Sequence, residues 1–168
     1  TSYENGKILS VKPSIVLGNE LVTNGDFATD SDWTANNATI SGGKANFNIV
    51  SGAYAKLNQA ISYTSGRVYK LTAIVNGTNG NKVRFRDDVG DSGGLTSTNG
   101  QITMNGADQS VEFIFIATVN SDEIAIERQD TSGNYSFTVD NVSIKEVIDG
   151  DFDFTRNSSA TRVNSQGL

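Results

Sequence analysis

Residues 67–77 read RVYKLTAIVNG, and the order of apolar and polar side chains in this stretch decides the fold class. Tyr69 and Leu71 share one side of an extended chain, whereas Lys70 and Thr72 share the other side. This period of two residues is typical of a strand with one face against a core. The stretch therefore predicts a β-strand within a sheet that is buried on one side.

The same alternation recurs along the chain between turn signals, and no window of about eleven residues shows a helical apolar stripe. We predict ten strands, near residues 20–23, 38–40, 43–49, 53–62, 67–76, 82–86, 101–104, 110–118, 122–128 and 135–147. Turns are favoured at the Asn-Gly dipeptides, which begin at Asn5, Asn24, Asn76, Asn79, Asn99 and Asn105. Short strands at regular spacing predict an all-β protein, folded as an antiparallel β-sandwich.

The last predicted strand contains a break in its alternation. Phe137 and Val139 share one parity, whereas Val142 and Ile144 share the other. All four side chains can face one core only if the strand gains one extra residue between the two pairs. The sequence therefore predicts a β-bulge near Asp140.

The flanks of the sandwich differ from its strands. We expect an N-terminal arm over residues 1–18, a domain over residues 19–148, and a C-terminal arm or linker over residues 149–168. Both flanks are polar with scattered apolar residues and are too short for a core of their own. We therefore expect each of these extended arms either to dock on the sandwich or to bind a partner chain.

Composition excludes several classes of function. The 168 residues include no cysteine and no histidine, so a thiolate or imidazole metal site is excluded. The net charge of −6 argues against a nucleic-acid partner, because such binding neutralises phosphates with basic side chains. The apolar run FIFIA at residues 113–117 is too short to cross a bilayer, so we expect no membrane insertion.

The pentapeptide GDSGG at residues 90–94 resembles the segment around the nucleophile of trypsin-like proteases. Ser92 would need a base to activate it, and the histidine that those enzymes use is absent. Asp87, Asp88 and Asp91 lie in one glycine-rich loop, unlike the opposed carboxylates of glycoside hydrolases. We therefore expect a mobile surface loop and no catalytic residue.

Five segments occur in an order that resembles a known group of proteins. They read NELVTNGDFATDSDWT at 19–34, ISGGKANFNI at 40–49, YAKLNQAI at 54–61, SGRVYKLTAIVNG at 65–77 and FTVDNVSIKEV at 137–147. This pattern resembles carbohydrate-binding modules of the galactose-binding-like jelly-roll kind. The resemblance covers roughly residues 19–147 and implies a jelly-roll sandwich. It implies that Trp33 packs against the core, whereas an exposed Trp33 would be a surface for sugar stacking.

The resemblance also implies a structural calcium ion where the first and last strands meet. It assigns the ion to oxygens around Gly25 and to the carboxylate of Asp140. The acidic residue that commonly follows the phenylalanine of the opening motif is here Ala28. Calcium takes six to eight oxygen ligands, so Asp26 or Asp30 would have to substitute for the missing acid.

The tail gives a second resemblance. Residues 154–168 read FTRNSSATRVNSQGL, which is similar to a stretch in phage tail and virion structural proteins. This implies a virion or extracellular location, with the chain as a homo-oligomer or in several copies and its arms bound to other virion proteins.

A glycan is the other expected partner. Leu57 and Phe85 are expected to point inward, so their polar neighbours point outward. An aromatic ring among hydrogen-bonding groups suits a sugar, although such polar side chains are also common on solvated faces. The candidate carbohydrate-binding residues are Tyr54, Lys56, Asn58, Arg84, Arg86 and Glu127.

Two functions remain open at this point. The first is a non-catalytic structural or decoration module of a virion, which attaches through its arms and either binds no glycan or also binds glycans for host or surface adhesion. The second is a carbohydrate-binding module of a secreted polysaccharide-degrading enzyme.

Overall fold

The computed structural model describes residues 15–86, 95, 100–118, 120, 122–128 and 132–148. Residues 17–148 form one compact unit. The expected arms lie largely outside the described residues, as does Ser92. No described segment is a helix that could span a membrane.

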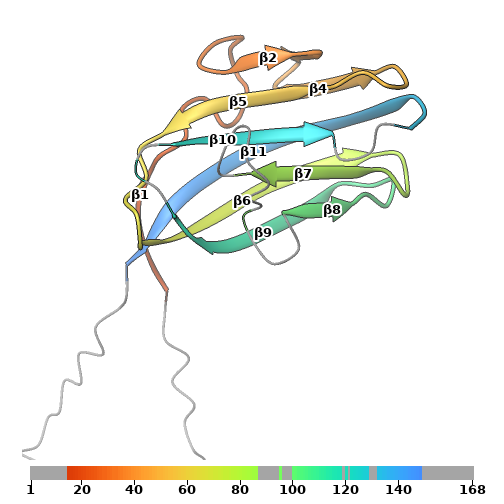
Figure 1. Ribbon diagram of the computed structural model, residues 1–168. Coiled ribbons are helices and arrows are strands. Elements are labelled where there is room, and N and C mark those ends of the chain that lie inside the picture. Colours follow the sequence, from red (N-terminus) through yellow and green to blue (C-terminus); the bar gives the residue numbers. More distant parts are fainter. Residues whose placement is uncertain are drawn as a thin grey trace, which may run out of the picture. The chain divides into compact units, whose positions relative to one another are not determined.

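Two antiparallel sheets form the sandwich, as the alternation predicts (Figure 1). The six-stranded sheet has the order β3-β4-β11-β6-β9, and β1 pairs with β11. Its strands are β1 Val16–Glu20, β3 Ala38–Ser41, β4 Lys44–Ile49, β6 Val68–Gly77, β9 Gln109–Ile116 and β11 Tyr135–Ile148. The five-stranded sheet has the order β2-β5-β10-β7-β8. Its strands are β2 Thr34–Asn36, β5 Lys56–Ile61, β7 Lys82–Arg86, β8 Gln101–Thr103 and β10 Asp122–Arg128.

The core lies between the two sheets and is built from the inward residues of every long strand. Leu57, Leu71 and Phe85 have no exposed surface, which confirms the predicted inward parity of β5, β6 and β7. Phe47 of β4 and Phe137 of β11 lie opposite each other, with ring centroids 4.2 Å apart in a stacked arrangement. This pair packs the centre of the six-stranded sheet.

The predicted bulge in β11 is confirmed. The pairing of β11 with β6 shifts register between Asp140 and Ser143, and Asn141 has φ 51°. On either side of the shift, Val139 and Val142 are both buried although their positions differ by three, an odd number that would otherwise place them on opposite faces. One extra residue therefore turns both halves of the strand toward the same core.

Glu20 and Gly25 connect the start of the domain to this bulge. The Glu20 carboxylate accepts hydrogen bonds from the backbone N–H groups of Leu21 and Ile144 and from the Ser143 hydroxyl. The Gly25 carbonyl oxygen accepts a hydrogen bond from Val142 N at 2.8 Å. The sequence does not indicate this role for Glu20, because Ser143 and Ile144 lie 123 and 124 residues away along the chain.

Three sequence predictions need correction. The first strand covers residues 16–20 instead of 20–23, and the short edge strand β2 was not predicted. The Asn-Gly dipeptide at Asn76 lies inside β6, and the turn comes at Asn79-Gly80. Gly77 is needed for packing instead, because a Cβ atom there would lie 2.4 Å from the sulfur of Met104.

Trp33 packs against the core as expected. Its ring lies 5.3 Å from that of the buried Phe27, and its Nε1–H donates a hydrogen bond to the carbonyl oxygen of Asn24. Gln59 of β5 holds the same loop, since its side chain bonds both the N–H and the carbonyl group of Thr23. The opening loop is therefore fixed to both sheets.

The contact between Gly25 and β11 predicts a large cost for Gly25→Ala. A Cβ atom at Gly25 would lie 2.0 Å from the carbonyl oxygen of Val142, so backbone must shift and the bond between the two residues weakens. We expect a loss of about 3 kcal/mol in the free energy of unfolding, measured by urea denaturation.

Gly18→Ala is the matched control for this substitution. A Cβ atom at Gly18 meets Ile148 only at 3.4 Å, so the change should stay within about 0.5 kcal/mol. Equal stabilities of the two variants would contradict the proposed contact.

Candidate functional site

The outward face of the five-stranded sheet brings together the strand residues predicted for carbohydrate binding. Directly opposite residues in paired strands point to the same face. Lys56 lies opposite Glu127, which in turn lies opposite Arg84. Asn58 and Arg86 lie in the adjacent row, with one β10 residue between them. Strand pairing thus collects these five residues into two neighbouring rows.

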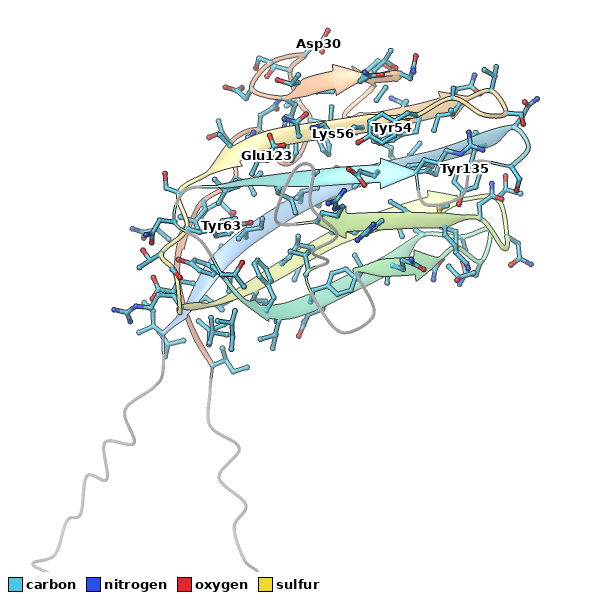
Figure 2. The ribbon with its side chains drawn as sticks, in the orientation of Figure 1. Asp30, Tyr54, Lys56, Tyr63, Glu123 and Tyr135 are labelled. Carbon is cyan, nitrogen blue, oxygen red and sulfur yellow. The ribbon has the colours of Figure 1, made fainter. Side chains whose placement is uncertain are left out.

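Tyr54 joins this face from the chain just before β5 (Figure 2). The residue is 51% exposed, and its hydroxyl donates a hydrogen bond of 2.8 Å to Glu127 Oε1. Burial of the hydroxyl end and this hydrogen bond raise the pKa of Tyr54 to about 12. The phenol therefore stays protonated as a donor to Glu127 while much of the residue remains exposed.

Arg86 and Glu127 lie on the outward face but are buried. Arg86 Nη1 lies 3.4 Å from both carboxylate oxygens of Glu127, and the two residues are only 9% and 5% exposed. The expectation of two solvent-facing side chains is therefore corrected: they pair with each other, and the Tyr54 hydroxyl also contacts Glu127. A buried ion pair of this kind holds its neighbours in place.

Glu123 of β10 organises the other end of the face. Lys56 Nζ lies 3.3 Å from Glu123 Oε1, and Asn58 Nδ2 donates a hydrogen bond of 2.6 Å to Glu123 Oε2. Figure 2 shows Lys56 beside Tyr54, and Glu123 on the neighbouring strand farther from Tyr54. Sequence reasoning missed Glu123, although it has the same parity as Glu127 on β10.

Arg84 contributes positive charge between Glu127 and the β8 residue Gln101. Burial, followed by repulsion from Arg86, lowers the pKa of Arg84. The neighbouring guanidinium groups thus concentrate positive charge on one side of the face.

Two exposed residues of β2 extend the face and were also missed. Thr34 lies opposite Asn58, and Asn36 lies opposite Lys56. The only signal available was that they alternate around Ala35, which is too short a pattern to predict a strand. They add a hydroxyl and a carboxamide beside the predicted residues.

This arrangement is suited to binding a neutral or weakly charged polar ligand. A partly exposed ring provides a surface for stacking, and the carboxamide, ammonium and hydroxyl groups around it form hydrogen bonds. Glu123 and Glu127 lie on the same strand, β10, and form ion pairs with Lys56 and Arg86, respectively. They do not face each other across a gap, as the two carboxylates of a glycoside hydrolase do.

The donor set expected for calcium fits poorly. The Gly25 carbonyl oxygen already accepts a hydrogen bond from the Val142 N–H group. The carboxylates of Asp26 and Asp140 each accept a hydrogen bond from a nearby backbone N–H group. Asp30 points away from the strands (Figure 2). In the part of the chain that the structure describes, no three acidic side chains come close enough to hold a metal ion.

The six-stranded sheet carries a depression of about 880 Å³ on its own outer face. Strands β3, β4, β6 and β11 form its floor, and the turns around Thr78 and Gly106 form part of its rim. The depression contains none of the predicted carbohydrate-binding residues. The two sheets therefore present two separate outer surfaces of different chemistry.

No family model matches the chain, and no curated protein matches it in sequence. Solved structures do share its fold. The N-terminal cellulose-binding domain of the Cellulomonas fimi β-1,4-glucanase C matches with a TM-score of 0.57 and 12% identity, over 75% of this chain and 94% of that domain. The carbohydrate-binding module TmCBM61, solved with β-1,4-galactotriose, matches with a TM-score of 0.53 and 16% identity, over 76% of this chain and 98% of that chain.

A phage protein is also similar. The enzymatically active domain of tailspike protein 4 from bacteriophage CBA120 matches with a TM-score of 0.53 and 14% identity. The match covers 76% of this chain but only 21% of the tailspike chain. The predicted jelly-roll sandwich is thus the fold of carbohydrate-binding modules and of one part of a phage tailspike.

The donor geometry predicts that calcium does not stabilise this domain. A ligand that binds only the native state raises the melting temperature by mass action. Because Glu20 and Gly25 already hold the bulge through hydrogen bonds, we expect the melting curves in excess calcium and in excess EDTA to coincide. A melting temperature that is higher in calcium than in EDTA, with the difference lost in Asp140→Asn, would contradict this prediction.

Proposed function

We propose that this chain is a non-catalytic glycan-binding module, and that its binding surface is the outward face of the five-stranded sheet around Tyr54. One observation carries the proposal. A half-exposed aromatic residue is held by a buried ion pair and shares its face with hydrogen-bonding side chains from β2, β5 and β7. This is the combination that sugar recognition requires.

Each part of the face has a role in this proposal. The Tyr54 ring stacks on the CH face of a sugar ring, and Lys56, Asn58 and Arg84 bind its hydroxyl groups. Buried Glu127 is a positioning residue, because it holds the Tyr54 hydroxyl without being exposed itself. A ring that is fixed before binding loses little conformational entropy when the ligand arrives.

The fold supports the proposal, since it is shared with modules whose names state cellulose binding or a galactotriose complex. With one aromatic side chain at the binding surface, we expect a dissociation constant of about 1 mM, equivalent to about −4 kcal/mol. Affinity of this order becomes useful when many copies bind one surface.

We further propose a virion location, with attachment through residues 1–14 and 149–168. The support is the resemblance of residues 154–168 to virion proteins, together with the fold shared with part of a phage tailspike. The alternative is a module of a secreted polysaccharide-degrading enzyme, which the cellulose-binding neighbour from a glucanase favours.

Substitution of Tyr54 tests the binding surface. Tyr54→Ala removes the stacking ring, so we expect glycan affinity to fall about tenfold, equivalent to about 1.4 kcal/mol. Tyr54→Phe keeps the ring and loses only the bond to Glu127, so we expect a loss within about threefold. The measurement is titration calorimetry with the best ligand from a glycan array.

Two further results check this prediction. Ile114→Ala is the control, because Ile114 is 47% exposed on the other sheet and should leave affinity unchanged. Affinity should also stay constant between about pH 6 and 9, since a pKa of about 12 keeps the Tyr54 hydroxyl protonated. Full affinity in Tyr54→Ala would disprove the proposed surface.

Removal of residues 1–14 and 149–168 separates attachment from binding. Ordering an arm costs about 1 to 2 kcal/mol per residue in backbone entropy, so attachment needs extended contact with a partner. We expect the trimmed chain to keep its glycan affinity and to lose incorporation into particles. Unchanged incorporation would reject the virion role and favour the module of a secreted enzyme.

A further inference from the structure

We propose that the depression on the outer face of the six-stranded sheet is a second binding site, and that it takes a neutral ligand rich in hydroxyl groups, such as an uncharged oligosaccharide. This site is separate from the Tyr54 face and does not depend on it. Its lining residues are contributed by four strands and two turns, all within the described part of the chain.

A row of uncharged polar side chains crosses the depression. Thr39, Asn46, Thr138 and Asn76 lie directly opposite one another on β3, β4, β11 and β6. Adjacent strands lie about 4.8 Å apart, so Asn46 and Asn76 are separated by about 10 Å. The row therefore offers several hydrogen-bonding groups along a length greater than one sugar ring.

Two carboxamide groups in this row are already oriented. Asn46 Nδ2 donates to the Ser41 and Lys44 carbonyl oxygens, each at 3.0 Å. Asn76 Nδ2 donates to Asp108 Oδ1 at 2.6 Å. These bonds use both N–H groups of Asn46 and one of Asn76, so each carboxamide is oriented and presents its carbonyl oxygen as an acceptor. Two fixed acceptors suit a ligand that carries many hydroxyl donors.

A second row adds exposed groups. Asn48 of β4 lies opposite Ser136 of β11, and both side chains are exposed. The floor beneath the two rows is rigid, since the stacked Phe47 and Phe137 pack on the inner side of the same two strands. A binding surface on packed strands needs little rearrangement when a ligand binds.

The lining also indicates which ligands are disfavoured. None of the twelve lining residues is charged, so the depression offers no partner for a phosphate or carboxylate group. The only lining aromatic residues are Phe47 and Phe137, which are buried, so the apolar centre typical of a protein interface is missing from this surface. A neutral hydroxyl-rich chain is the ligand that remains.

The test uses the full chain with Tyr54→Ala, so that signals from the other face are removed. The probes are cellohexaose and mannohexaose, with hexagalacturonate as the charged probe of similar length. We expect the neutral probes to shift the side-chain amide resonances of Asn46, Asn48 and Asn76 in NMR titrations. Hexagalacturonate should leave these resonances unchanged at the same concentration.

Variants of the depression complete the experiment. Asn48→Ala combined with Ser136→Ala should weaken binding of the neutral probe at least about fivefold, because two hydrogen bonds are lost. Ser110→Ala is the control, since Ser110 is exposed on β9 outside this depression and should have no effect. Absence of shifts, equal binding of hexagalacturonate, or full affinity in the double variant would each overturn the proposal.

The two proposals fail in distinguishable ways. If the Tyr54 face binds no glycan, the NMR resonances of Lys56 and Asn58 will not shift during titration of the unsubstituted chain. If the depression binds no glycan, the side-chain amide resonances of Asn46 and Asn76 will not shift during titration of Tyr54→Ala.

Discussion

The bulge in β11 is the constraint on which the rest of the structure depends. This strand is central to the six-stranded sheet, because it pairs with β4 and β6 and also with β1. Without the extra residue at Asn141, one half of β11 would turn its apolar side chains to solvent. The carboxylate of Glu20 and the carbonyl of Gly25 bond the backbone on the far side of this break. The first strand and the last strand are thereby held together at the point where the register changes.

The same alternation that builds the core creates two outer faces. Every inward side chain of β5, β7 and β10 leaves a neighbour on the outer side of the five-stranded sheet, and pairing gathers these neighbours into rows. The charges in these rows are then balanced locally, by Glu123 with Lys56 and by Glu127 with Arg86. The buried Arg86–Glu127 pair costs desolvation free energy, so it is weak evidence for stability, and Glu127 also holds the Tyr54 hydroxyl. The consequence is a ring at Tyr54 whose hydroxyl end is fixed.

The two faces differ in chemistry although they belong to one sandwich. One combines an aromatic ring with balanced charges, and the other offers only carboxamide and hydroxyl groups over a stacked aromatic floor. If both proposed sites bind glycans, the domain contacts two chains of one polysaccharide, or two different glycans, at the same time. Simultaneous engagement raises the effective affinity of weak sites without any new contact.

The sequence by itself determined the sandwich, the inward parity of the long strands, the bulge and five outward residues that share one face. It could do so because alternation along a strand and the tolerance of a turn for positive φ are local properties. Only the tertiary structure decided that β2 completes the five-stranded sheet, that Glu123 binds Lys56 and Asn58, and that Arg86 and Glu127 are buried. It also formed the row from Thr39 to Asn76 across four strands. These features depend on which strands become neighbours, and that choice is made by contacts between residues far apart in the chain.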